Sequence, residues 1–83
     1  MMPIDDLRAL LEKAFPGDGV HLHSEDNHHF QCLIVSDRFE GHSMVERHQM
    51  VYSALGNAME EAVHALALKT YTPGQWDKLG GRA

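Results

Sequence analysis

The stretch Phe30-Gln31-Cys32-Leu33-Ile34-Val35 is the segment on which the predicted fold depends. Its residues are almost all apolar, which is typical of a strand in the middle of a sheet. The earlier stretch Val20-His21-Leu22-His23 alternates apolar and histidine side chains, as expected of a short strand with one face in water. Because only a short polar loop that begins Ser24-Glu25-Asp26-Asn27 separates the two stretches, the sequence predicts a β-hairpin.

A helix is predicted before this hairpin, over about Pro3 to Phe15. Pro3 suits the first helical turn, and Asp5 and Asp6 complement the positive end of the helix dipole. Phe15-Pro16-Gly17 ends the helix. Its apolar residues recur at helical spacing, at Ile4, Leu7, Leu10, Leu11 and Ala14.

A second helix is predicted after the hairpin. Phe39-Glu40-Gly41-His42 reads as a turn, and Ser43 with Glu46 then forms a capping box that opens the helix. Gly56-Asn57 interrupts it, and Asn57 with Glu60 restarts a shorter helix that runs through Val63. The predicted apolar face of the first of these helices consists of Met44, Val45, His48, Val51, Tyr52 and Leu55.

The C-terminal part contains a third strand, predicted from Ala65 to Tyr71, and a last short helix. Thr72-Pro73-Gly74-Gln75 is a second capping box, with proline at the first helical position. The helix that it opens carries Trp76 and Leu79, and residues 80–83 form a frayed tail. The predicted fold class is therefore α+β, in one domain over residues 1–83, with a three-stranded sheet backed by helices.

Composition excludes several classes of protein. The formal net charge of −5 disfavours nucleic-acid binding, which usually needs a basic surface. No apolar run approaches the roughly 20 residues of a membrane span, and the acidic N-terminal stretch argues against a secretory signal. The single cysteine cannot form an internal disulfide, which fits a cytoplasmic location. Seven histidines in 83 residues are an excess that points to metal binding or to proton-linked behaviour.

Two long blocks, residues 39–52 and 64–76, together with the pair His29-Phe30, resemble the BolA family, and the short loop looks closest to its compact, IbaG-like bacterial members. The resemblance covers nearly the whole chain. It implies a type II KH-like domain, which agrees with the predicted order helix, strand, strand, helix, helix, strand, helix. It also implies a heterodimer with a monothiol glutaredoxin of the CGFS type, bridged by a [2Fe–2S] cluster, in iron–sulfur cluster trafficking or in iron or redox sensing.

In this family the glutaredoxin and glutathione each supply one cysteine ligand. The BolA partner supplies a histidine at the head of the third strand and a histidine or cysteine from the loop between the first two strands. By this resemblance His64 is the first candidate ligand, and its alternative role is to cap the preceding helix. For the loop ligand we rank His28 before His29 and His29 before His23, and the alternative for each is a solvated histidine.

The chemistry of the residues fits such a shared site. A [2Fe–2S] cluster takes four ligands, so a chain with one cysteine cannot hold it with thiolates alone but can offer two imidazoles to one iron. Cys32 shares strand parity with Phe30 and is predicted to lie in the core. Arg47 and Lys69 are candidate contacts for the partner or for the carboxylates of glutathione, or else solvated basic side chains.

Three other histidines have plainer interpretations. His48 is predicted to be partly buried with its hydrogen bonds satisfied, and His21 and His42 are predicted to be exposed.

A nucleic-acid-binding transcriptional regulator, in a stress response, is the alternative function. True KH domains clamp nucleic acid with a GXXG loop, whereas the matching turn here reads Gly41-His42-Ser43-Met44. A homodimer is a further possibility for the isolated chain. An enzyme is not expected, because Cys32 is predicted to be buried and no phosphate-binding loop or HExxH motif occurs.

Overall fold

A three-stranded mixed sheet is the centre of the computed structural model, which describes residues 3–17, 19–26, 28–56 and 65–81. Strand β2 lies in the middle, antiparallel to β1 and parallel to β3. The described elements are α1 (Ile4–Ala14), β1 (Gly19–His23), β2 (His29–Val35), the 3₁₀ turn η1 (Asp37–Phe39), α2 (Met44–Leu55), β3 (Ala65–Tyr71) and α4 (Pro73–Lys78). The α+β class, the central strand and the strand order are as predicted.

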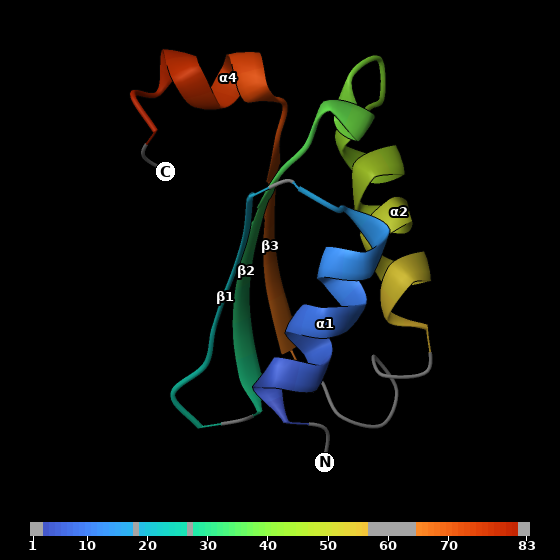
Figure 1. Cartoon of the computed structure of the whole chain (residues 1–83), viewed down its shortest axis with the longest axis vertical. Helices are drawn as coiled ribbons and strands as arrows, with labels where there is room; N and C mark the ends of the chain where they lie inside the picture. Colours follow the sequence, from blue (N-terminus) through green and yellow to red (C-terminus); the bar gives the residue numbers. More distant parts are fainter. Residues whose placement is uncertain (1–2, 18, 27, 57–64, 82–83) are drawn as a thin grey trace.

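Helices α1 and α2 cover one face of the sheet, and α4 lies beyond the end of β3 (Figure 1). The side chains of Phe30, Cys32 and Ile34 alternate along β2 and point into the layer between sheet and helices. The opposite face of the sheet carries no described helix. The buried core consists of Leu7, Leu11, Phe15, Leu22, Phe30, Cys32, Ile34, Phe39, Val51 and Leu55.

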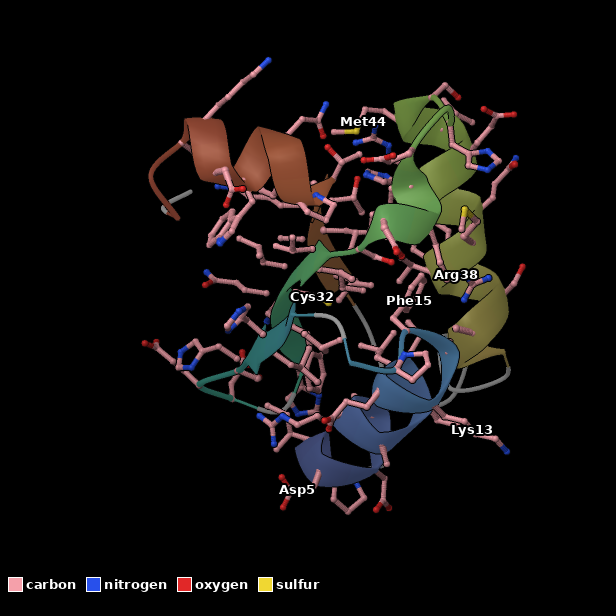
Figure 2. All side chains as sticks on the ribbon, turned by 45° about the horizontal axis from the view of Figure 1, so that its top comes forward. Asp5, Lys13, Phe15, Cys32, Arg38 and Met44 are labelled. Atoms are coloured by element: carbon pink, nitrogen blue, oxygen red, sulfur yellow. The ribbon has the colours of Figure 1, made fainter. Side chains whose placement is uncertain are left out.

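The predicted turn at residues 39–42 is present between β2 and α2, closed by a hydrogen bond from the His42 backbone N–H to the Phe39 carbonyl oxygen at 3.1 Å. The 3₁₀ turn η1 comes first, because the Ser36 hydroxyl accepts a hydrogen bond from the Arg38 backbone N–H and caps it. This turn places the Phe39 ring in the core, 5.3 Å between centroids from Phe15. The Arg38 guanidinium lies 5.0 Å from the centroid of the Phe15 ring, at its outer side (Figure 2). Gly41, at φ = 78°, supplies the left-handed backbone that reverses the chain towards α2.

Both predicted capping boxes are present. At α2 the Ser43 hydroxyl accepts from the Glu46 N–H, and the Glu46 carboxylate accepts from the Ser43 N–H. These bonds lower the pKa of Glu46 because they favour its ionised form. At α4, Thr72 and Gln75 form the same reciprocal pair, with Pro73 at the first helical position.

The predicted apolar face of α2 is partly wrong. The residues of α2 that are buried are Arg47, Val51 and Leu55, spaced by four, whereas Val45 is 67% exposed and Met44 is 55% exposed. Tyr52 is exposed as well. The stripe that meets α1 and β3 is therefore rotated from the predicted one, and a charged residue occupies its first position.

Arg47 can take that position because its head group is hydrogen-bonded within the chain. Its Nε donates to the His42 carbonyl oxygen at 3.0 Å, and Nη1 donates to Gln75 Oε1 at 2.9 Å. The guanidinium also lies 5.9 Å from the centroid of the Phe39 ring. Arg47 thus joins the turn before α2, helix α2 and helix α4, and its aliphatic stem covers apolar surface.

His48 also differs from its prediction. It is half-buried as expected, but its Nε2 is buried and finds no hydrogen-bond partner among the residues that the structure describes. The ring meets Tyr52 edge-on, with centroids 6.4 Å apart. His21 and His42 are exposed, as predicted. The predicted helix that ends at Val63 lies outside the described residues.

Candidate functional site

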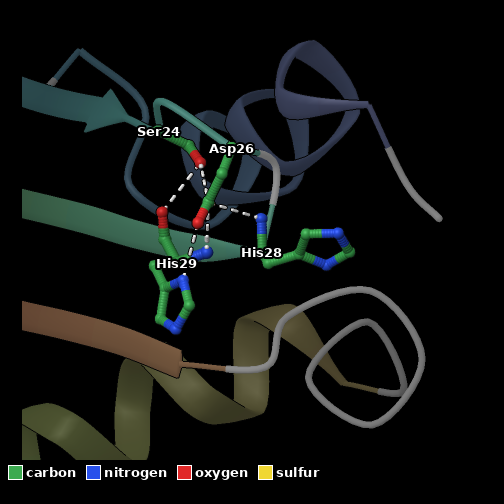
Figure 3. Close-up of polar contacts among 4 residues, drawn as sticks. All are labelled: Ser24, Asp26, His28 and His29. Atoms are coloured by element: carbon green, nitrogen blue, oxygen red, sulfur yellow. Dashed lines mark hydrogen bonds and ion pairs between the residues drawn. The ribbon is translucent and has the colours of Figure 1, made fainter.

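The loop between β1 and β2 is organised around the carboxylate of Asp26 (Figure 3). Its Oδ1 accepts hydrogen bonds from the backbone N–H groups of His28 at 2.9 Å and His29 at 2.8 Å. The Ser24 hydroxyl lies 3.4 Å from the same oxygen and donates at 2.7 Å to the His29 carbonyl oxygen. This is the local side-chain-to-backbone pattern by which aspartate stabilises a turn.

The second oxygen of Asp26 contacts the imidazole of His29. The distance from His29 Nδ1 to Asp26 Oδ2 is 2.7 Å, within the range of a charge-assisted hydrogen bond. Together these bonds hold the pKa of Asp26 well below its ordinary value, with the backbone N–H of His29 as the largest cause. The carboxylate is therefore ionised at neutral pH and can only accept hydrogen bonds.

The three candidate loop ligands have different surroundings. His29 begins β2 with its side chain 73% exposed, and it lines a small hollow on the open sheet face together with His23, Gln31 and Ala67. The Nε2 of His23 lies 3.8 Å from a carboxylate oxygen of Glu25. The ring of His28 points away from the Asp26 carboxylate (Figure 3). His28 does not line this hollow.

His64, the first candidate ligand, lies outside the described residues, as does any contact that it makes. The described part of β3 begins at the following residue, Ala65, and Ala65 pairs with His29 in the parallel register of β2 and β3. The loop histidines and the chain segment next to His64 therefore meet at the same end of the sheet.

Cys32 is in the core, as predicted. It is 3% exposed, and this burial raises the pKa of the thiol to about 12. The thiol therefore packs as a small apolar group of the core, because the reactive form of cysteine is the thiolate. In the described segments no three histidine, cysteine or acidic side chains converge on one point that could hold a metal ion.

The two basic candidates differ in exposure. Lys69 is exposed on the open face of the sheet, where it lines a hollow with His21, Leu33 and Ala67. Arg47 is 8% exposed, and its guanidinium donates hydrogen bonds to His42 and Gln75 of the same chain. A role of either residue towards a partner stays a prediction.

Asp26 and Ser24 are the residues of this site that sequence patterns did not single out. The signal for Asp26 was available: aspartate followed by asparagine in a short polar loop favours a turn closed by the side chain. Sequence alone does not reveal that its second oxygen reaches His29.

A protein-family model described as BolA-like protein matches residues 12–75. The chain belongs to the BolA family. The chain is 49% identical over 51 residues to the DNA-binding transcriptional regulator BolA of Escherichia coli, in a match that covers 61% of this chain and 49% of that protein. It is 34% identical over 76 residues to the acid stress protein IbaG of the same organism, covering 90% of this chain and 89% of IbaG.

The fold agrees with that of solved BolA proteins. The solution structure of BolA1 from Mus musculus superimposes with a TM-score of 0.84 at 34% sequence identity, covering 96% of this chain and 73% of that one. The chain spans about half the length of the E. coli BolA protein that it matches. None of the helices that the structure describes is long and apolar enough to cross a membrane.

Proposed function

We propose that this BolA-family chain is the partner of a monothiol glutaredoxin of the CGFS type and that the two proteins share a [2Fe–2S] cluster with glutathione. In this proposal His64 and one histidine of the β1–β2 loop are the ligands from this chain, and the glutaredoxin and glutathione provide the thiolates. The observation that carries the proposal is the pairing of His29 with Ala65, the residue that follows His64.

The donor set supports a shared site. An exposed imidazole at the start of β2 is available to an incoming protein, while the buried thiol of Cys32 is not. Histidine ligation raises the reduction potential of a [2Fe–2S] centre relative to four thiolates. A cluster bound in this way would respond to redox state and to pH, and it could serve as a signal or be passed on to another protein. Both delivery and sensing are compatible with the site.

Purified chain, a CGFS-type glutaredoxin, glutathione, iron and sulfide should be mixed and followed by size-exclusion chromatography and visible circular dichroism. We expect a heterodimer whose spectrum differs from that of the glutaredoxin alone, and we expect His64→Ala to lose that difference. His42→Ala is the matched control, because His42 is an exposed histidine on the turn before α2. If the wild-type chain changes neither the size nor the spectrum of the glutaredoxin, the proposal fails.

Binding of DNA is the second candidate, favoured by the similarity to the E. coli DNA-binding transcriptional regulator BolA. The net charge of −5 weighs against it. Binding to duplex DNA with an affinity that falls steeply as salt increases would support this candidate.

A further inference from the structure

The hydrogen bonds of Asp26 are those of a residue that orients a metal-binding histidine. Its Oδ1 is held by two backbone N–H groups, from His28 and His29, so the carboxylate cannot rotate freely. Its Oδ2 is consequently fixed where it meets His29 Nδ1, at 2.7 Å. Histidine ligands of metals commonly donate their other ring N–H to a carboxylate in this way, which fixes the tautomer and the orientation of the ring.

The Asp26 contact determines which nitrogen of His29 can bind a metal. An ionised carboxylate has no proton to donate, so the hydrogen in the 2.7 Å contact belongs to Nδ1 of the imidazole. In the neutral ring Nε2 then carries the lone pair, and this is the nitrogen that a metal binds. The side chain is 73% exposed, so a partner can reach it.

These contacts distinguish His29 from the other two candidate ligands, His23 and His28. The described side-chain contact of His23 is with Glu25, at 3.8 Å, too long for a hydrogen bond that would fix a tautomer. The Asp26 carboxylate accepts a hydrogen bond from the backbone N–H of His28, whereas it contacts both the backbone N–H and the ring Nδ1 of His29. His29 also sits beside Ala65 in the sheet register, whereas His28 precedes β2.

We propose that His29 is the loop ligand, through Nε2, and that Asp26 is the positioning residue that keeps the proton on Nδ1. This inference rests on the proposed function, because it names the second ligand of the same site. It reverses the order expected from sequence, in which His28 preceded His29.

Asp26→Asn is the decisive variant. The asparagine oxygen can still accept from the two backbone N–H groups, but its NH₂ group then faces Nδ1 and requires that nitrogen to be an acceptor. The proton moves to Nε2, which closes the ligating position without removing the imidazole. The control is Glu25→Gln, the same loss of charge one residue away, at an exposed side chain.

Two measurements read the result. Nitrogen-15 NMR of the isolated chain, labelled at histidine, reports the tautomer of His29 without any cluster. Visible circular dichroism in a glutaredoxin titration, with glutathione, iron and sulfide present, reports cluster sharing. We expect the Nδ1–H tautomer in the wild type and in Glu25→Gln, and the Nε2–H tautomer in Asp26→Asn. We also expect about 10- to 100-fold weaker sharing for Asp26→Asn, a loss for His29→Ala, and no change for His28→Ala.

Each alternative outcome has a distinct meaning. A wild-type His29 with its proton on Nε2 would overturn the role of Asp26. Normal cluster sharing by Asp26→Asn and His29→Ala, with a loss for His28→Ala, would overturn the ligand assignment and leave the proposed function standing. Absence of a cluster complex with the wild-type chain would refute the proposed function, and the ligand role of His29 with it.

Discussion

Replacement of Arg47 by methionine should destabilise the fold, because the structure makes this residue a buried connector between α2, the preceding turn and α4. Methionine preserves most of the apolar stem but removes the hydrogen bonds to the His42 carbonyl oxygen and to Gln75 Oε1. A hydrogen bond to a charged group contributes about 1.5–3 kcal/mol. His42 and Gln75 are exposed, so water can reach the two acceptors and the lower value applies to each.

The expected loss in the free energy of unfolding is therefore about 3 kcal/mol. A domain of this length has a total stability of only about 4–12 kcal/mol, so the loss is a large fraction of it. The melting temperature should fall by about 12–24 °C, at roughly 4–8 °C per kcal/mol. Urea unfolding followed by far-ultraviolet circular dichroism measures the change directly.

Lys69→Met is the matched control for Arg47→Met, because it removes the same charge from an exposed side chain and should change stability by less than about 0.5 kcal/mol. A double-mutant cycle with Gln75→Ala should give a coupling energy of about 0.5–3 kcal/mol. If Arg47→Met were as stable as Lys69→Met, the connecting role of Arg47 would be wrong, and a role on the surface towards a partner would gain support.

Three further predictions concern single groups. Burial raises the pKa of the Cys32 thiol from 9.0 to about 12. The stability that the buried neutral thiol contributes to the fold is therefore complete below pH 9 and is lost above pH 9, at about 1.4 kcal/mol per pH unit. The difference in the free energy of unfolding between wild type and Cys32→Ala should fall over that window. Because the pKa of Asp26 is lowered from 3.8, the stability that its ionised carboxylate contributes to the fold is present above pH 4 and is lost in acid. The free energies of unfolding of Asp26→Asn and wild type should therefore converge as the pH falls below 4. Ser43→Ala removes a capping hydrogen bond of α2 and should cost about 1 kcal/mol in urea unfolding, and an unchanged midpoint would contradict the capping role.

Features that depend on neighbouring residues in the sequence could be predicted from it. The capping boxes at Ser43 and Thr72 are defined by four consecutive residues, and both are present. The burial of Cys32 follows from its parity with Phe30, because alternate residues of a strand share a face. The central position of β2 likewise follows from its nearly continuous apolar residues.

Features set by distant contacts could not be predicted. The buried stripe of α2 begins at Arg47, and no local pattern shows that Gln75, 28 residues later, accepts a hydrogen bond from it. Hydropathy instead favoured Met44 and Val45, which are exposed. The contact between Asp26 and the His29 ring depends on the backbone path of the loop, so sequence placed both residues in the loop region without joining them.

Binding of the shared cluster by histidine from this chain can be tested on the bound atoms. The chain should be labelled with nitrogen-15 at histidine only and mixed with unlabelled glutaredoxin, glutathione, iron and sulfide, and the cluster reduced for pulsed electron paramagnetic resonance. We predict strong couplings to nitrogen-15 that persist in His28→Ala and decrease in His64→Ala and in His29→Ala. A reduced cluster without coupling to nitrogen-15 would show that the histidines of this chain do not bind iron, and would refute the proposed function.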